Sequence, residues 1–326
     1  MNSKQKRGFI TIAVGDYYRY LAKNLAITYH MNGESEKPIA IVTDTTDPEI
    51  EKLFDIVILE NEPIESGYLY KLKLHKYTPF EETIFLDADQ FIIDKLNPFW
   101  QLFNDVDFGV IGINSKSIKG ARNFFSLEKV IEKFGVDEVP KFQGGIYYFK
   151  NNESAVKVFT DAIIFSDDYD FFEMPRFVNA ENLVGSKGDE PLISLAMAVN
   201  KHKAILDPWK RTGYNLNKTK GLDLNILKRK CTYLKSKKRI YPTIVHFGTD
   251  RTKMYHYKRE AFKIKMAYYK GIPGWLSNLF LVPYTMWYAS KCIAWQVLTL
   301  YRYNGFELLP IKDPWFGIIR KIKKRI

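Results

Sequence analysis

Two aspartates separated by one residue are the feature of the sequence that most clearly points to chemistry. Asp87 and Asp89 follow the apolar run Ile84–Leu86, and a second apolar run, Phe91–Ile93, comes directly after them. Residues i and i+2 of an extended chain point to one side, so both carboxylates can face one ligand. Close carboxylates repel each other unless a proton or a cation lies between them. The pattern therefore indicates a divalent cation such as Mg²⁺ or Mn²⁺, which prefers oxygen ligands and often carries nucleotide phosphates.

An ordinary exit from a strand is the alternative interpretation of the same triplet, because Asp is common in turns. The flanking apolar runs argue against it, since folding alone does not require two acids between two hydrophobic segments. The carboxyl end of a strand in an open α/β sheet is also where ligands bind. We therefore interpret Asp87 and Asp89 as ligand-binding residues.

The elements that must position these aspartates alternate between short β-branched runs and helical stretches. Strands are predicted at 9–14, 38–42, 56–59, 83–86, 108–113, 145–149, 203–206 and 243–247. Helices are predicted at 17–31, 68–77, 153–165 and 190–199. Such alternation predicts an α/β fold, with a mainly parallel sheet covered by helices on both faces.

The length and composition of the chain suit one large α/β domain with an appendage. The sequence has 326 residues, of which 46% are hydrophobic, enough for a substantial core. Its net charge of +12 favours an anionic partner. Cys231 and Cys292 form no CxxC pattern, which argues against a disulfide scaffold or a thiolate zinc site. The polar, basic start shows no signal-peptide pattern, so we expect a cytoplasmic location.

The C-terminal region, 256–326, differs in character from the preceding 255 residues. Its stretch 272–303 is apolar and aromatic but is interrupted by Pro283 and Lys291, and five of the last seven residues are basic. Aromatic residues between basic clusters suit the membrane–water interface, so we expect a helical extension that attaches peripherally to the inner face of a membrane. Helices packed on the preceding domain are an alternative. A transmembrane span is disfavoured, because no clean apolar run of ~20 residues remains.

Five motifs, in order, resemble those of the glycogenin-like, family 8 group of retaining GT-A glycosyltransferases. They are FITIAVGDYYRYLAKNLAITYH, YKLKLHKYTPFEETIFLDADQFII, FQGGIYYF, GDEPLIS and IVHFGTDRTK. The resemblance covers about residues 8–255 and implies a GT-A (Rossmann-like) catalytic domain over 1–255. It also implies transfer of a sugar from a UDP-sugar donor to a glycan or lipid-linked acceptor, with retention of the anomeric configuration.

The same resemblance implies roles for individual residues. Asp87, Asp89 and His246 would hold Mn²⁺ (or Mg²⁺), while Asp189, Glu190 and Lys71 would act near the reacting sugar and phosphates. The donor would contact a larger set, namely Ile12, Val14, Gly15, Tyr18, Lys71, Asp87, Ala88, Asp89, Gln143, Gly144, Gly145, Gly248 and Lys253.

Three positions depart from the pattern of this group. Gln143 stands where Asn is usual, which bears on the sugar that fits. Ser186 stands where glycogenin has Asp, which argues against self-glucosylation of that kind. The spacing from His246 to Lys253 is one residue longer than usual, so the assignment of Lys253 to phosphate binding is weaker.

Several of these residues also have ordinary structural interpretations. A lone His at a strand end, as His246 is, is usually hydrogen-bonded in the core, and Lys71 could be a solvated helix residue. Tyr18 could pack its helix on the sheet, and Gly144–Gly145 could mark a bulge or a close backbone approach.

Other functions remain open at this point. A sugar nucleotidyltransferase would normally carry a Gly-rich, Arg-containing loop after the first strand, and AVGDYYRYLAKN lacks that pattern. A nucleic-acid-binding protein is suggested by the net charge and by the basic segment Lys218–Arg239, which we expect to form an exposed loop or short helix. No recognised nucleic-acid module is visible, so we expect no nucleic-acid partner. A non-catalytic sugar-binding module is disfavoured by the complete set of metal-site residues.

Overall fold

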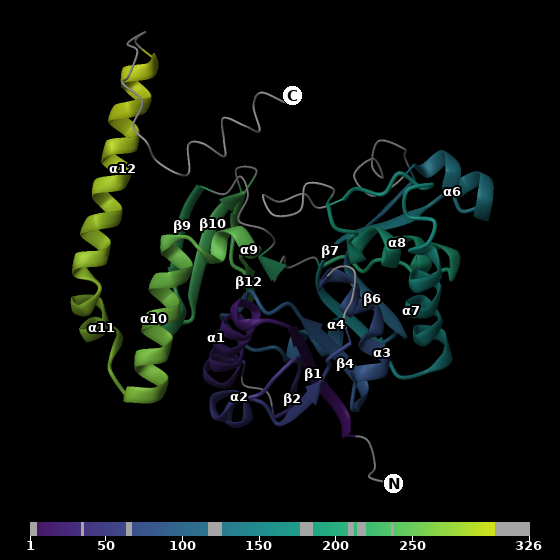
Figure 1. Ribbon diagram of the computed structural model, residues 1–326, viewed down its shortest axis with the longest axis horizontal. Coiled ribbons are helices and arrows are strands. Elements are labelled where there is room, and N and C mark those ends of the chain that lie inside the picture. Colours follow the sequence, from purple (N-terminus) through teal and green to yellow (C-terminus); the bar gives the residue numbers. More distant parts are fainter. Residues whose placement is uncertain are drawn as a thin grey trace.

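A six-stranded sheet forms the centre of the molecule (Figure 1). The computed structural model describes residues 5–33, 36–62, 67–116, 126–176, 185–207, 212–213, 220–235 and 238–303. The strand order is β3-β2-β1-β4-β7-β6, with the strands β1 Gln5–Ala13, β2 Ile39–Thr43, β3 Ile56–Leu59, β4 Phe80–Leu86, β6 Phe108–Ser115 and β7 Val139–Lys150. The first four are parallel, and β7 runs antiparallel to both its neighbours. The predicted mainly parallel sheet is therefore confirmed.

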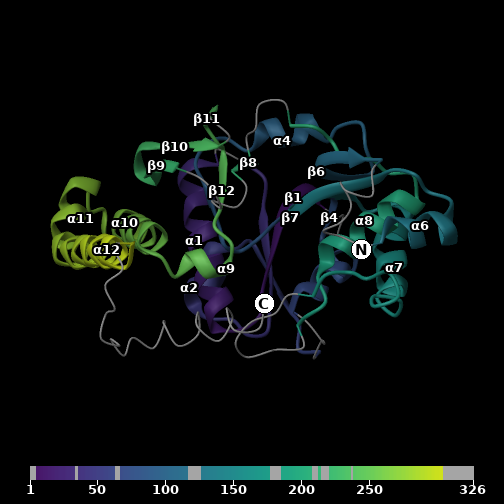
Figure 2. The same ribbon diagram turned by 90° about the horizontal axis from the view of Figure 1, so that it is seen from above.

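Helices cover both faces of this sheet, as expected (Figure 2). They are α1 Asp16–Asn32, α2 Pro48–Leu53, α3 Leu74–Tyr77, α4 Asn97–Leu102, α6 Leu127–Phe134, α7 Glu153–Phe165 and α8 Asp189–Val199, with a 3₁₀ helix, η1, at Gly67–Lys73. One apolar cluster joins α1 and α4 to one face, and another joins α3, α7 and α8 to the other. Alternate residues of each strand therefore enter different cores.

Two predicted elements differ from the observed ones. The helix predicted at 68–77 is mostly the tighter η1, with only its last turn α-helical. The strand predicted at 203–206 is reduced to a single bridge between Ile205 and Ile111. The side chain of Asn114 takes the place of further ladder hydrogen bonds there. Its Oδ1 atom accepts the Ala204 N–H at 2.9 Å, and its Nδ2 atom donates to the Ala204 carbonyl at 3.1 Å.

Two three-stranded sheets flank the main one. The first pairs β12 Ile244–His246 with β5 Gln90–Ile92 and β8 Thr212–Gly213. The second is antiparallel and contains β9 Lys220–Asn225, β10 Lys230–Lys235 and β11 Lys238–Ile240, with the 3₁₀ helix η2 Ile226–Lys228 between the first two.

The second small sheet shows that the prediction of a loop or short helix at Lys218–Arg239 is wrong for the residues that the structure describes. Leu224, Cys231 and Tyr233 are buried in the core, whereas Leu234 and Lys230 are exposed. The two paired strands thus bury a few apolar side chains, although the segment as a whole is strongly basic.

The C-terminal extension is helical as far as the structure describes it. The short helix α9 Thr249–Thr252 precedes it, and it is formed by α10 Tyr255–Lys270, α11 Gly274–Phe280 and α12 Val282–Tyr303. Residues 304–326, with the basic tail, lie outside the described residues. None of the described helices has the length and apolar character needed to cross a membrane.

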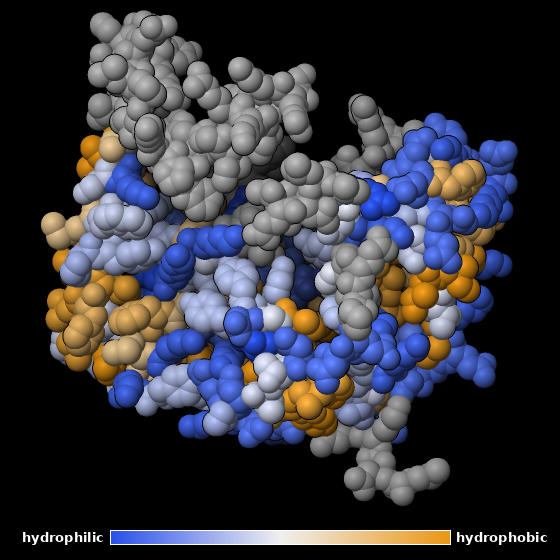
Figure 3. All heavy atoms as spheres, viewed as in Figure 1, coloured by the Kyte–Doolittle hydropathy of each residue, from blue (hydrophilic) through white to orange (hydrophobic). Residues whose placement is uncertain are grey.

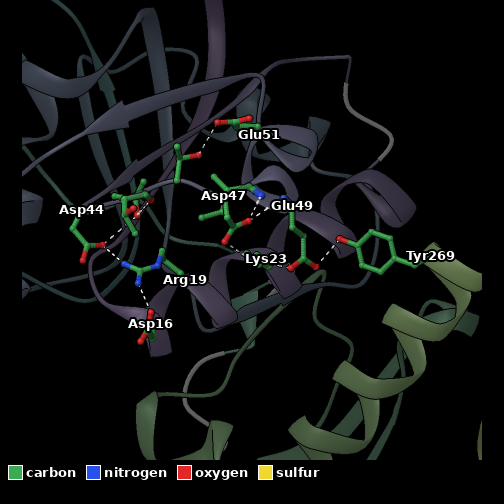
Figure 4. A network of polar contacts seen from close by, with 12 residues as sticks. Asp16, Arg19, Lys23, Asp44, Asp47, Glu49, Glu51 and Tyr269 are labelled. Atoms are coloured by element: carbon green, nitrogen blue, oxygen red, sulfur yellow. Dashed lines mark hydrogen bonds and ion pairs between the residues drawn. The ribbon is translucent and has the colours of Figure 1, made fainter.

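Helix α10 packs on α1 and contributes to the main core. Tyr257 is fully buried and stacks on Phe91, with ring centroids 4.5 Å apart. At the far end of the helix, the Tyr269 hydroxyl donates to Glu49 of α2 at 2.8 Å, and Glu49 also pairs with Lys23 of α1 at 2.9 Å (Figure 4). The predicted domain boundary at residue 255 stays a prediction, but α10 itself is tied to the main sheet.

Candidate active site

Two neighbouring aspartates and a histidine distant from them in the sequence meet at the carboxyl end of β4. Asp87 and Asp89 lie in the turn that joins β4 to β5, and His246 is the last residue of β12, opposite Gln90 in the β5–β12 register. The Nε2 atom of His246 lies 2.9 Å from Oδ1 of Asp89 and 3.6 Å from Oδ2 of Asp87. One ligand atom from each of the three residues lies within 4.8 Å of the others.

The charges of this cluster are only partly balanced by the protein. Burial raises the pKa of Asp87, against the effect of Lys71, and the nearby charge of Asp89 raises it further. For Asp89 burial acts in the same direction, but the charge of His246 and its hydrogen bond outweigh it and lower the pKa. Two carboxylate oxygens and one imidazole nitrogen, held close together in a largely buried place, fit a divalent cation.

Lys71 of η1 is the cation nearest to this cluster. Its side chain is 11% exposed, and its Nζ atom lies 2.9 Å from Oδ1 of Asp87 and 3.4 Å from Oδ2 of Asp189, and donates to the carbonyl of Gly144 at 3.0 Å. Burial opposes the charge of Lys71, but the carboxylates of Asp189 and Asp87 raise its pKa above the ordinary value. Lys71 is therefore not the solvated helix residue of the alternative interpretation.

Gly144 and Gly145 of β7 form the wall of the site. A Cβ atom on Gly144 would lie 2.5 Å from the Tyr147 hydroxyl and 2.7 Å from Oδ2 of Asp189, and one on Gly145 would lie 2.6 Å from Nδ1 of His246. Such contacts are too short for any side chain. The two glycines are thus required by close approach, which brings the backbone of β7 against the acidic cluster.

Asp189 and Glu190 begin α8 beside this wall. Asp189 is buried and accepts a hydrogen bond from the Tyr147 hydroxyl, while Oε1 of Glu190 accepts the Gly144 N–H at 2.7 Å. Burial, and then the charge of Asp189, raise the pKa of Glu190 to about 7. Glu190 can therefore gain or lose a proton near neutral pH.

The residues predicted to contact the nucleotide lie around the end of β1. Ile12 and Val14 are half-buried, and Tyr18 is 41% exposed on α1. Gly15 begins α1 with a φ of +90°, which a residue with a side chain rarely adopts, and its N–H donates to Oδ1 of Asp44 at 3.0 Å. Asp44 also pairs with Arg19 of α1 (Figure 4).

The segment after β12 approaches the same helix. Gly248, with a φ of +71°, begins the short helix α9. Thr252 contacts the Tyr17 hydroxyl, and the exposed Lys253 has its Nζ 5.8 Å from the centroid of the Tyr17 ring. Lys253 therefore lies beside the start of α1.

The structure thus brings eight of the sixteen predicted residues into one cluster of mutual contacts. Lys71, Asp87, Asp89, Gly144, Gly145, Asp189, Glu190 and His246 are linked by the contacts given above. Gln143 is half-buried in β7, and its Oε1 atom has no hydrogen-bond partner within the described part of the chain. Tyr18 projects from α1 toward solvent.

Three further residues belong to the site and were not predicted. Asp44 directly follows the buried strand β2, the same signal that singled out Asp87 after β4. Tyr147 bonds Asp189, and the Gln90 amide donates to the carbonyl of Gly145 at 2.7 Å. In the sequence, Tyr147 and Gln90 cannot be distinguished from ordinary strand residues, because their contacts arise only when β7 and β5 pack against other elements.

Comparison with known proteins finds similarity in structure alone. No protein-family model matches the sequence, and no curated protein matches it. A crystal structure of an active-site mutant of LgtC is 13% identical, covers 80% of this chain and 95% of its own, and has a TM-score of 0.51. A structure of the galactosyltransferase LgtC in complex with donor and acceptor sugar analogs is 14% identical, covers 78% of this chain and 95% of its own, and has a TM-score of 0.49. The structure of mouse xyloside xylosyltransferase 1 is 11% identical, covers 76% of this chain and 99% of its own, and has a TM-score of 0.47. With its mixed sheet of mostly parallel strands between helices, the chain has the GT-A fold, the fold expected from the resemblance of its motifs.

Proposed function

We propose that this protein is a metal-dependent glycosyltransferase that uses a UDP-sugar donor. The observation that carries the proposal is the cluster of Asp87, Asp89 and His246, with Lys71 beside it, at the carboxyl end of a central strand. Ligands bind at this edge in open α/β sheets. LgtC, which shares the fold, is a galactosyltransferase.

Asp87, Asp89 and His246 would hold Mn²⁺ or Mg²⁺. When bound, such an ion neutralises the negative charge that develops on a departing diphosphate, without proton transfer. Lys71 supplies a second positive charge at the same place. Its ammonium group now contacts Asp87, Asp189 and the Gly144 carbonyl, and it can donate to a phosphate or sugar oxygen in the same way.

The wall of β7 is suited to the sugar. Gly144 and Gly145 bring backbone close to the acidic cluster. The Oε1 atom of Gln143, which has no hydrogen-bond partner among the described residues, can accept a hydrogen bond from a sugar hydroxyl. Asp189, oriented by Tyr147, is our candidate for holding the acceptor or the reacting face, and Glu190 can hold or release a proton beside it.

The finer features of the reaction follow from the resemblance of the motifs. We propose retention of the anomeric configuration and an acceptor that is a glycan or a lipid-linked glycan precursor. Gly15, Tyr18 and the half-buried Ile12 and Val14 are our candidates for contacts to the uracil and ribose. A cytoplasmic, peripheral membrane location would suit such an acceptor.

Calorimetric titration of UDP, with and without Mn²⁺, tests the proposal. We expect binding that requires Mn²⁺ and that falls at least about 100-fold when Asp87 and Asp89 are both changed to Asn, since each charged contact contributes about 1.5–3 kcal/mol. Asp94→Asn is the matched control, because this exposed carboxylate lies shortly after β5, at the opposite end of that strand from the two aspartates. Metal-independent binding, or no nucleotide binding by the folded protein, would contradict the proposal. Metal-dependent binding would be followed by transfer assays with individual UDP-sugars.

A further inference from the structure

A cavity lies away from the acidic cluster, between β9 and the C-terminal helices. It has a volume of about 490 Å³ and is lined by residues of β9, α10, α11 and α12, among them Leu224, Arg259, Lys263, Thr285 and Met286. None of the residues assigned to the donor site lines it. Figure 2 shows these helices on the side of α1 that faces away from the main sheet.

Positive charge is in excess at this cavity. Lys263 is 3% exposed, and both its Nζ atom and Nε of Arg259 contact Oε1 of the fully buried Glu260, at 3.1 and 2.8 Å. One carboxylate is thus shared by two cations. Asp223, the acid among the residues that line the cavity, is paired with Lys230 at 2.5 Å.

A buried ammonium group has three N–H donors, and Glu260 accounts for only one of those of Lys263 in the described contacts. Burying a charge without full compensation is unfavourable, so an anion in the cavity would stabilise this arrangement. Arg259 is held in place by its bond to the carbonyl of Leu224 at 2.6 Å and by the ring of Tyr255, 5.6 Å from its guanidinium carbon.

The rim of the cavity continues into an exposed apolar surface. Seven large apolar side chains of α11 and α12 are each at least 44% exposed, namely Trp275, Leu279, Phe280, Val282, Met286, Trp287 and Ile293. Val282 and Met286 also line the cavity. Figure 3 shows hydrophobic residues gathered at the left edge of the molecule, over α11 and the start of α12. A surface of this kind on a soluble protein marks an interaction site.

The position of α12 is set by its first turns. Tyr288 stacks on Tyr255 of α10, with centroids 4.3 Å apart, and the Tyr255 hydroxyl bonds Thr285 at 2.9 Å. Lys291 lies over the ring of Trp287, with its Nζ 4.5 Å from the centroid. Aromatic rings beside Lys side chains, next to a cationic cavity, match the boundary between lipid headgroups and acyl chains.

We propose that the apolar face of α11 and α12 lies in the surface of a membrane, and that the cavity receives the headgroup of an anionic phospholipid. Arg259 and Lys263 would bind the headgroup phosphate, while the lipid chains would extend along Met286 and its exposed neighbours. The site is independent of the donor site, so the proposal can fail without affecting the proposed sugar transfer.

Sedimentation of the full-length protein with vesicles tests this site. We expect stronger binding to phosphatidylcholine vesicles that contain phosphatidylglycerol than to phosphatidylcholine alone. Arg259→Gln is expected to weaken the binding to anionic vesicles by on the order of tenfold or more, because a direct contact to phosphate is lost. Lys258→Gln removes the same charge from an exposed position of the same helix and should cost about fivefold at most. Arg259→Lys should retain most of the preference.

A second variant tests the apolar face without touching the cavity charges. Trp275→Ser combined with Trp287→Ser is expected to weaken binding to both kinds of vesicle, whereas Tyr241→Ser, at a position 65% exposed between β11 and β12, should not. Thermal melting of each variant confirms that it is folded. Equal binding of the native protein to neutral and anionic vesicles, or equal losses for Arg259→Gln and Lys258→Gln, would overturn the proposal. Stabilisation by inorganic phosphate through Arg259, without vesicle binding, would identify a free anion and also overturn it.

Discussion

The glycines of β7 show how little free volume the candidate site has at the level of single residues. Gly144→Ala would place a Cβ atom 2.5 Å from the Tyr147 hydroxyl, in a strand paired on both sides. We expect a loss of about 1–3 kcal/mol in the free energy of unfolding, together with weaker donor binding. Gly67→Ala is the control, since a Cβ atom at that position would point into open space. Urea denaturation of the two variants measures the difference, and similar losses for both would contradict this account.

Glu190 makes stability depend on pH. Its pKa is raised from the ordinary value of 4.5 to about 7 in the folded state, so the folded protein binds more protons than the unfolded chain between these values. Stability must therefore decrease as pH rises from about 4.5 to 7. Glu190→Gln keeps an acceptor for the Gly144 N–H but removes this effect.

Glu190→Gln changes the free energy of unfolding of the metal-free protein by an amount that depends on pH. We expect this change to be more stabilising at pH 8 than at pH 4.5, by up to about 3 kcal/mol. Urea denaturation at the two pH values, in the presence of a chelator, measures the change. An effect that is the same at both values would show that Glu190 does not titrate between them.

At the scale of elements, the basic segment that forms β9, β10 and β11 is a genuine part of the core. Tyr233 is 1% exposed and belongs to the cluster that also contains Phe91 and Tyr257. We expect Tyr233→Ala to lower the free energy of unfolding by about 3 kcal/mol or more. Leu234→Ala, at the adjacent position that is 39% exposed, should cost under about 1 kcal/mol. If both substitutions were tolerated equally, this sheet would not pack as described.

At the scale of the whole molecule, α10 links the C-terminal helices to the α/β core. Tyr257, Ala261 and Ile264 are almost completely buried, and Tyr257 lies against both Phe91 and Phe247. Removing α10 would expose these rings, and each large apolar side chain contributes about 1.5–3 kcal/mol when buried. That loss is comparable to the total stability of a typical domain, about 5–15 kcal/mol.

We therefore expect a chain that ends at Gly271, after α10, to fold cooperatively, whereas a chain that ends at Met254 should be unfolded or aggregated. Thermal unfolding monitored by circular dichroism distinguishes the two. The same pair of truncations tests the domain boundary predicted at residue 255. A folded 1–254 chain would show that α10 is dispensable to the core.

Local patterns in the sequence determined the central architecture and the two aspartates of the site. The strands β1, β2, β3 and β4 have short apolar runs, and α7 and α8 have clear helical ones, so their order alone predicts the sheet. Asp87 and Asp89 were identified because a single turn after β4 contains both. The resemblance of the motifs added His246, Lys71 and the β7 glycines.

Only the tertiary structure decided the remaining features, because they depend on contacts between segments distant in sequence. The β5–β12 pairing brings His246 to the aspartates, and the packing of η1 and α8 on β7 places Lys71 beside Asp189. The β9–β11 sheet was missed since alternation over so few residues is weak beside a strong run of charge. Pairing and burial between distant segments produce no local periodic pattern in the sequence. A strand followed directly by its own turn does produce such a pattern, and it can therefore be predicted.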